Sequence, residues 1–411
     1  MNRRKFIKLS GLSTAGLTLG MPVVSRSIHN KSSNNLINIG IIGTGDRGDW
    51  IVYLAKSVPD IRITACCDIL PSHLENGLKE ATKGAHGYSD YRKLLDNKDL
   101  DAVIIATPLH LHYRMAVDTL DAGKHVFCEK TMTYNIEQAI DLEQKVIGTD
   151  LIFQVGYQTR NNPLIQSIKQ MIQNEYCGRL THVRCNYHRN GNWRRPVPDP
   201  DLENLINWRM YWKYSGGLMA ELCSHHIDLT NWMLDSHPLK VTGFGGVDYW
   251  KDGRETFDNV NTVYEYPNGV KAMFTSITTN AHYDISLQFM GTLGTIEINN
   301  EEGQQAKFYA ETKLLERQIE AEESEGIYGV TAATYQAWKK GEGTPIKVEN
   351  QPKGDEETTG LALRHFAECI QNEQIPVSNV RSGRQSSIAV HMANKAMRES
   401  TIEYWHKSYG N

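Results

Sequence analysis

The sequence predicts an α/β protein in which a parallel sheet domain is followed by an α+β domain with a large, mostly antiparallel open sheet. Three observations predict it: an apolar strand running into a glycine-rich turn at residues 37–48, alternating strand-like and helix-like segments up to residue 150, and strand-like runs with hairpin turns thereafter. Because 411 residues are too many for one ordinary core, we expect two domains. We place an N-terminal signal and linker at 1–30, the first domain at 31–150 and the second at 151–411.

The glycine-rich turn joins the first predicted strand directly to a predicted helix. Gly43 permits the tight turn, Gly45 lets the backbone approach a pyrophosphate, and Gly48 lets the helix pack closely against the strand. A pyrophosphate would then meet free N–H groups at the positive end of the helix. We therefore expect a Rossmann domain that binds a dinucleotide through Gly43, Gly45, Asp46, Arg47 and Gly48.

An acidic residue ends the second predicted strand, at residues 61–68. Asp68 lies twenty positions beyond the last glycine of the turn, where a carboxylate accepts hydrogen bonds from the adenosine ribose hydroxyls. The alternative is an ordinary turn at a strand end. Asp68 is followed by Ile69, Leu70 and Pro71, and not by a basic residue that would hold a 2′-phosphate. The expected cofactor is therefore NAD in preference to NADP.

Two further strands are predicted at residues 101–108 and 124–130, with a helix at 111–122 between them that Gly123 ends. In parallel sheets of this kind, ligands bind at the carboxyl ends of the strands. The residues that this rule places at the cofactor are Thr107, Pro108, His110, His112, Glu129 and Lys130.

The pattern changes after residue 151. Strands are predicted at 151–157, 180–187, 240–249, 260–266, 270–278, 285–291 and 295–298, and helices at 163–174, 358–371 and 383–400. Hairpin turns at 267–269 and 291–294 indicate mostly antiparallel pairing with helices on one face. Seven cysteines form no Cys-x-x-Cys pair, so we expect mostly buried thiols.

The net charge of the chain bears on its binding partners, and the N-terminal segment bears on its cellular compartment. The formal net charge is −4 with no long basic run beyond the N-terminus, which argues against a nucleic-acid surface. Arg3 and Arg4, followed by Phe6 and Lys8, resemble a twin-arginine export signal and predict a periplasmic protein. The apolar stretch at 9–24 is short and rich in small residues, so no stable membrane span is expected in the mature form. A frayed basic terminus or an uncleaved anchor is the alternative.

Three motifs resemble a known family: ATPLHLH at residues 106–112, AGKHV at 122–126 and CEKT at 128–131. Together with the glycine turn and in this order, they resemble the Gfo/Idh/MocA oxidoreductases over about residues 36–400. The resemblance implies a Rossmann domain followed by an open α/β sheet, and oxidation or reduction of sugars, inositols and related polyols with a nicotinamide cofactor. It also implies assembly through the open sheet face into a homo-oligomer, a dimer or a tetramer.

The resemblance implies that Lys130 is catalytic, because it matches the lysine of the family's Glu-Lys-Pro motif, whose ammonium touches the reacting oxygen. A lysine there can polarise a carbonyl, or help to take up a proton once burial lowers its pKa. Thr131 replaces the proline, which removes a constraint on the turn and keeps the amine. The alternative is a surface lysine paired with Glu129.

A second catalytic segment is implied at residues 216–228, which resembles the family's Gly-Gly, then Asp, then His four residues later. Positions four apart share one helix face, so Glu221 and His225 can meet one substrate, with His225 as the general base. Glu221 stands for the usual aspartate and Cys223 for a usual glycine. With a third ligand Glu221, His225 and His226 could hold a divalent ion, but we expect no metal and a structural His226.

Further contacts come from residues 156–160, which resemble the family's first segment of the second domain and place Gln158 at the cofactor and Arg160 at the substrate. A polar and aromatic cluster with His188, Trp193 and Arg194 suits a sugar face and its hydroxyls, with ordinary loop packing as the alternative. The predicted substrate contacts are Arg160, His188, Trp193, Arg194, Glu221 and His225.

These predictions converge on an exported, NAD-dependent oxidoreductase that transfers hydride between a sugar or glycoside ring carbon, with C3 favoured, and a tightly bound nicotinamide. Outside the cytoplasm the cofactor would have to stay bound and be recycled in place. A glycosidase that uses bound NAD for transient oxidation at C3, elimination and hydration is the alternative. A non-catalytic sugar-binding relative is a third possibility.

Overall fold

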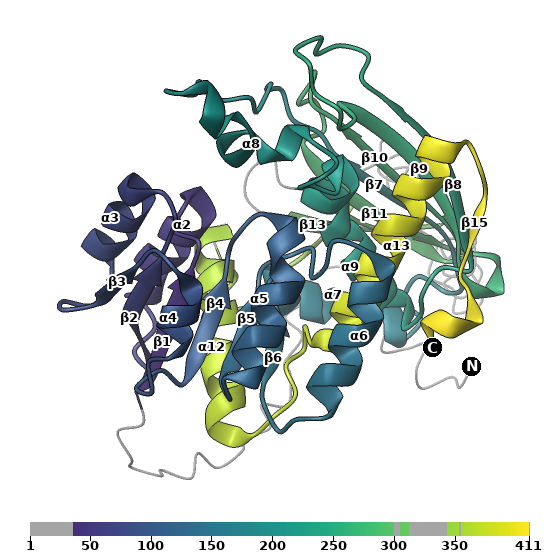
Figure 1. The fold of residues 1–411 in the computed structure, drawn as a ribbon. Helices are drawn as coiled ribbons and strands as arrows, with labels where there is room; N and C mark the ends of the chain where they lie inside the picture. The colour runs from purple at the N-terminus through teal and green to yellow at the C-terminus, as the bar shows by residue number, and fades with distance from the viewer. Residues whose placement is uncertain (1–35, 300–304, 312–342, 353–354, 411) are drawn as a thin grey trace, which may run out of the picture.

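The computed structural model describes residues 36–299, 305–311, 343–352 and 355–410. Its first part is a six-stranded parallel sheet in the order β3-β2-β1-β4-β5-β6 (Figure 1). The strands are β1 (Ile37–Ile42), β2 (Ile61–Cys67), β3 (His86–Tyr88), β4 (Ala102–Ile105), β5 (His125–Cys128) and β6 (Phe153–Val155). The helices between them are α2 (Asp46–Ala55), α3 (Pro71–Glu80), α4 (Tyr91–Leu95), α5 (Leu109–Asp121) and α6 (Ile136–Ile147). This strand order is that of the Rossmann fold, as the sequence predicts.

Strand β6 extends the first sheet beyond residue 150, where we placed the domain boundary. Phe153 pairs in parallel with Val126 of β5, so the strand predicted at the start of the second domain completes the first sheet. The second domain then continues with η1 (Gln158–Asn161) and α7 (Pro163–Gln173).

The second part is built on a nine-stranded sheet in the order β14-β13-β12-β11-β7-β10-β9-β8-β15. Its strands are β7 (Leu180–Tyr187), β8 (Lys240–Gly246), β9 (Asn259–Glu265), β10 (Lys271–Ile277), β11 (Ile285–Gly291), β12 (Gly294–Asn299), β13 (Gln305–Ala310), β14 (Thr344–Ile346) and β15 (Glu403–Tyr404). All neighbours pair antiparallel except β7 and β10, which are parallel. The mostly antiparallel sheet predicted from the hairpin turns is therefore confirmed.

The connector from β7 to the helices carries η2 (Pro200–Leu202), α8 (Glu203–Ile206), η3 (Trp208–Met210) and the π-helical turn η4 (Met219–Cys223). It continues into α9 (Ser224–Leu234), which with the later helix α13 (Val380–Glu399) lies against one face of the large sheet (Figure 1). The remaining short turns are η5 (Pro267–Gly269) and η6 (Lys407–Tyr409). The opposite sheet face exposes apolar side chains such as Phe244 and Val263.

Helix α12 (Asp355–Asn372) returns from the C-terminal part of the chain to the first domain, where it lies beside α2 (Figure 1). Ala362, Leu363 and Phe366 belong to the same buried cluster as the apolar side chains of β1 and β2. The ring of Phe366 packs edge-on against Phe127 of β5 with centroids 5.7 Å apart. The two domains are thus joined by shared apolar packing as well as by the chain crossing at β6.

All seven cysteines are buried and unpaired, as predicted. Within the described ranges, no helix has both the length and the apolar character needed to cross a membrane. The predicted export signal lies outside the described residues.

Candidate active site

The glycine turn after β1 leaves an open space over the first turn of α2. A Cβ atom at Gly48 would lie 1.8 Å from the carbonyl oxygen of Gly43, so this glycine is required for close helix–strand packing. Gly43 has a φ of +88°, and a Cβ there would lie 2.7 Å from the Ala106 carbonyl oxygen. A Cβ at Gly45 would approach only the His73 ring, at 3.6 Å. The backbone at Gly45 is therefore accessible to a phosphate, next to the unpaired amides of a helix N-terminus.

The carboxylate of Asp68 is fixed at the end of β2. Its oxygens accept hydrogen bonds from the backbone N–H groups of Thr44 (2.8 Å) and Leu70 (2.9 Å), and Asp68 lines the same cleft as the glycine turn. Each carboxylate oxygen has a further lone pair for a hydroxyl donor. This arrangement fits the ribose of a dinucleotide.

A cleft of about 1050 Å³ runs from the glycine turn to the second domain and is at the large end of ligand-site volumes. Two buried polar atoms that line it lack a hydrogen-bond partner among the described residues: Nδ1 of His110 and Oε1 of Gln158. Because buried polar atoms normally have a hydrogen-bond partner, we expect both atoms to bind a polar group of a ligand. Together with the free space at Gly45, they show that these residues fit NAD.

Lys130 follows β5 and reaches across the cleft to the second domain. Its ammonium donates a hydrogen bond to the backbone oxygen of Glu221 at 2.8 Å, and the Thr131 hydroxyl donates to the Ala220 oxygen at 3.0 Å. Burial lowers the pKa of the Lys130 ammonium, although the charges of Glu221 and Glu129 oppose the shift. The amine is therefore held in place and brought closer to proton transfer at neutral pH.

Glu221 lies in the π-helical turn η4, so the regular helix predicted for this segment is wrong in its first turn. Its carboxylate receives a hydrogen bond and ion pair from Arg209 at 2.9 Å. Burial alone would raise the pKa of the Glu221 carboxyl, but the charges of Arg209 and Lys130 outweigh it and hold the pKa below its usual value. Glu221 is therefore an anion with one side fixed by Arg209.

His225 lies in the first turn of α9 and lines the cleft with Lys130 and Glu221. Its ring packs against Tyr157 and Tyr187, with centroids 6.0 and 6.2 Å away, and makes no hydrogen bond within the described part of the chain. Burial and the Lys130 charge hold the pKa of His225 well below its usual value. A neutral imidazole with free ring nitrogens can accept a proton from a substrate hydroxyl.

Glu129 and His112 line the cleft and make contacts that fix neighbouring segments of the chain. Glu129 forms a partly buried ion pair with Arg47 at 2.8 Å, so the alternative in which it pairs with the Lys130 ammonium is not seen. His112 places its two ring nitrogens 2.9 and 2.8 Å from the carbonyl oxygens of Thr131 and Thr107. His112 is thereby held between these two backbone segments, which gives it a positioning role, and it lines the cleft where a cofactor contact is predicted. Thr107 and Pro108 line the cleft as predicted.

The predicted substrate contact of Arg160 is wrong. Arg160 is buried, forms a two-bond ion pair with Asp228 at 2.7 and 2.8 Å, and stacks on Trp232. Its guanidinium donors are therefore used within the second domain, away from the cleft.

The cluster predicted around residue 190 also lies outside the cleft lining. His188 contacts Thr275 and the His282 backbone, Trp193 packs against the core, and Arg194 pairs with Glu203 and Asp252. Tyr187, at the end of β7, does line the cleft, and so does Trp208 of the connector. The connector also supplies lining residues that we did not predict, among them Arg195, Arg209 and Tyr214. The only sequence signal for them is the alternation of aromatic and basic residues at 208–214.

Among the described residues, no group of three His, Cys, Asp or Glu side chains is placed to hold a metal ion. His226 turns away from the cleft and packs against Tyr187 with centroids 5.4 Å apart. Glu221 is paired with Arg209 and not with either histidine.

His226 provides a test of burial through the pH dependence of stability. Burial lowers its pKa from 6.5 to about 3, so below about pH 6.5 the unfolded chain binds a proton that the folded chain does not. The free energy of unfolding should then fall with decreasing pH, by about 1.4 kcal/mol per pH unit from this residue. The free energy of unfolding, measured by urea denaturation, should fall between pH 7 and pH 5 by about 2 kcal/mol less in His226→Gln than in wild type. An unchanged decrease would contradict the buried, neutral state.

The fold and the cleft define a dinucleotide-binding oxidoreductase with a lysine, a carboxylate and a neutral histidine at one end of the cofactor site. Residues 37–157 match the oxidoreductase family with an NAD-binding Rossmann fold, and residues 165–297 match the GFO/IDH/MocA C-terminal domain. The chain belongs to the Gfo/Idh/MocA family, and NAD is its cofactor.

Relatives and solved structures agree with this family. The chain is 24% identical over 346 residues to scyllo-inositol 2-dehydrogenase (NAD(+)) of Bacillus subtilis, covering 83% of this chain and 88% of the relative. It is 26% identical to levoglucosan dehydrogenase of Pseudarthrobacter phenanthrenivorans, covering 64% and 74%. A structure of levoglucosan dehydrogenase in complex with NADH has the same fold, with a TM-score of 0.72, 19% identity and coverage of 90% and 98%.

Proposed function

We propose that the protein is an exported oxidoreductase that transfers hydride between a ring carbon of a sugar or glycoside, with C3 favoured, and NAD that stays bound. The observation that carries this proposal is the meeting of Lys130, Glu221 and His225 in the cleft that holds the glycine turn. The inositol and levoglucosan dehydrogenases among the relatives support a polyol or sugar substrate.

The three side chains have distinct tasks in this proposal. Bound NAD supplies the hydride acceptor. The Lys130 ammonium donates a hydrogen bond to the reacting oxygen, and the neutral His225 ring accepts the hydroxyl proton. Glu221, fixed on one side by Arg209, accepts a hydrogen bond from a neighbouring hydroxyl and orients the ring. The contacts of His112 with the Thr107 and Thr131 backbone, and the ion pair of Glu129 with Arg47, fix the positions of the chain segments that carry these groups.

Retention of the cofactor is supported by an ion pair across the mouth of the cleft. Arg195 of the connector contacts Asp46 in the first turn of α2, with one N–O distance of 3.0 Å, and both residues line the cleft. The pair is partly exposed, at 50% and 67% of the two side chains. It therefore links the second domain to the phosphate-binding turn with a modest interaction energy.

Arg195→Ala should speed NAD dissociation by up to about fivefold, because a partly exposed ion pair contributes on the order of 1 kcal/mol or less. The dissociation rate is measured by displacement with excess labelled NAD. Arg194→Ala is the matched control, since Arg194 pairs with Glu203 and Asp252 away from the cleft. High salt should reduce the difference in NAD dissociation rate between wild type and Arg195→Ala, because it screens the ion pair. Equal rates for all three proteins at low salt would show that the pair does not retain NAD.

A glycosidase that oxidises C3 transiently is the second candidate. It is favoured by relatives such as the glycosyl hydrolase family 109 protein of Shewanella pealeana, which is 27% identical over 53% of this chain and 52% of the relative. The same three residues would serve both reactions. Incubation with aryl glycosides separates them: a keto-glycoside product without phenol supports the dehydrogenase, whereas phenol release without a keto-sugar supports the glycosidase.

Assembly through the open face of the large sheet is part of the proposal. Phe244 of β8 and Val263 of β9 are 84% and 42% exposed on that face, and contiguous exposed apolar side chains are typical of interfaces. The molar mass measured by light scattering should be that of a dimer or tetramer, and Phe244→Lys should lower this mass toward that of the monomer. Lys407→Ala, on η6, is a control expected to leave the mass unchanged. A monomeric wild-type protein would contradict this assembly.

Export is tested by the N-terminus of the protein recovered from the periplasmic fraction. The proposal expects a shortened N-terminus there, and loss of the periplasmic pool when Arg3 and Arg4 are both replaced by lysine. A full-length cytoplasmic protein in both cases would contradict it.

A further inference from the structure

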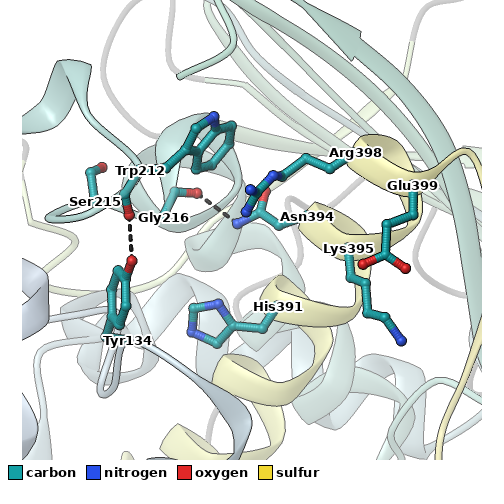
Figure 2. Close-up of a pocket in the computed structure, with 9 residues that line it drawn as sticks. All are labelled: Tyr134, Trp212, Ser215, Gly216, His391, Asn394, Lys395, Arg398 and Glu399. Carbon is teal, nitrogen blue, oxygen red and sulfur yellow. Dashed lines mark hydrogen bonds between the residues drawn. The ribbon is translucent and has the colours of Figure 1, made fainter. Parts of the chain in front are cut away.

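A second cavity of about 380 Å³ lies where the C-terminal half of α13 meets the chain segments that follow Lys130 and precede Glu221 (Figure 2). Its volume is within the range of small-molecule sites. Within the described residues, none of its lining side chains also lines the cleft. It is therefore a separate site and not an extension of the cofactor cleft.

Three hydrogen bonds from side chains to backbone oxygens fix the walls of this cavity. Figure 2 shows two of them, those of Tyr134 and Asn394. The Tyr134 hydroxyl donates to the Trp212 oxygen, and the Asn394 Nδ2 donates to the Gly216 oxygen at 2.8 Å. Nε2 of His391 lies 2.8 Å from the Thr133 oxygen. These bonds hold three chain segments around the space.

Two acceptor atoms on α13 remain for a ligand. Asn394 is only 7% exposed, and its Oδ1 is buried without a hydrogen-bond partner among the described residues. Burial lowers the pKa of His391, so the ring is neutral; with the proton on Nε2 facing Thr133, Nδ1 is an acceptor. Asn394 and His391 are three positions apart and share one face of the helix. Both require donors.

The mouth of the cavity supplies the complementary groups. The Arg398 guanidinium lies 5.1 Å from the centre of the Trp212 ring and forms no ion pair within the described part of the chain. Lys395 is already paired with Glu403 at 2.9 Å, and Glu399 adds a negative charge beside them. A simple anion would leave Oδ1 of Asn394 unpaired and would face Glu399. A hydroxylated molecule can donate to the inner acceptors and accept from Arg398 at once.

We propose that this cavity is a second carbohydrate site, which binds a small polyol or monosaccharide independently of the cleft. The bound molecule donates hydroxyl hydrogen bonds to Asn394 and His391 and accepts from Arg398. The inference does not depend on which reaction the cleft catalyses.

The test uses the full-length, NAD-loaded protein with myo-inositol and D-glucose as probes, and acetate as the anionic comparison. A crystal soaked in either sugar should show it in the cavity within hydrogen-bond distance of Asn394 Oδ1. Calorimetry should show that Asn394→Leu weakens binding at this site at least tenfold. If Asn394→Leu fails to fold, Arg398→Ala is the second variant, and it should also weaken sugar binding at this site. The control is Arg381→Ala, at an exposed arginine at the other end of α13, which should bind the sugars like wild type.

Only water in the cavity, or equal affinity for the sugars in wild type, Asn394→Leu and Arg398→Ala, would overturn the proposal. Binding of acetate without either sugar would show an anion site and would also overturn it.

Discussion

Lys130→Met should lower kcat by about 10²- to 10³-fold, the usual effect of removing one donor to a developing charge. The Lys130 ammonium is the group that reaches across the cleft, with its hydrogen bond to the Glu221 backbone at 2.8 Å. Methionine keeps an unbranched side chain of similar shape and removes the ammonium. Because the glycine turn and Asp68 are untouched, NAD should remain bound. Single-turnover reduction of the bound nucleotide by a sugar substrate measures the change.

Lys124→Met is a matched control for this substitution. Lys124 is also a buried lysine whose ammonium donates to backbone oxygens, those of Asn97 (2.7 Å) and Leu100 (2.9 Å), but it lies outside the cleft lining. The control should lose stability and keep its kcat within a few-fold. If Lys130→Met and Lys124→Met were equally active per folded molecule, Lys130 would not act on the reacting oxygen.

His225→Gln should lower kcat for sugar oxidation by about 10²- to 10⁴-fold, the range for loss of a general base. Burial and the Lys130 charge hold the pKa of His225 well below its usual value, so the base stays unprotonated at neutral pH. The rate in wild type should therefore stay level as pH falls through the usual titration range of histidine, near about 6.5, and decline only at lower pH. Stopped-flow rates across this range measure the profile.

His226→Gln is the matched control, since the adjacent histidine packs away from the cleft. It should alter the pH dependence of stability and leave kcat within a few-fold. An acid limb near pH 6.5 in wild type that disappears in His225→Gln would show a base with an ordinary pKa and contradict the buried, neutral His225. A kcat unchanged by His225→Gln would remove His225 from the mechanism.

The fold could be predicted from the sequence because its strongest determinants are local. The glycine spacing at 43, 45 and 48 encodes contacts within one turn, and Asp68 directly follows its own strand. Lys130 also lies at the end of a predicted strand, so strand direction places it toward the cleft, and the spacing of Glu221 and His225 places both on one helix face. The π-helical form of the turn at Glu221 could not be predicted in this way, because the hydrogen bonds of this turn with Lys130 and Thr131 join residues 91 and 89 positions apart.

The pairing of arginines could not be predicted in the same way. Arg160, Arg194, Arg195 and Arg209 are alike in sequence, and their partners lie 68, 9, 149 and 12 positions away, respectively. For the last three, the fold of the connector after β7 decides which side chain faces the cleft, and no periodic pattern in the connector predicts its path. The sequence therefore places Arg194 at the substrate and does not single out Arg195 and Arg209. Arg160 precedes the connector, and its ion pair with Asp228 depends on the packing of η1 against α9.

The central claim is that one cleft holds NAD and reduces it with a sugar. The most direct test is to purify the protein without added nucleotide, identify the bound nucleotide by mass spectrometry, and then follow its absorbance while single sugars and glycosides are added. The account predicts NAD at close to one per chain, its reduction by a sugar or glycoside, and a keto-sugar formed in equal amount. An absence of bound NAD, or bound NAD that no member of a broad sugar and glycoside panel reduces, would contradict it.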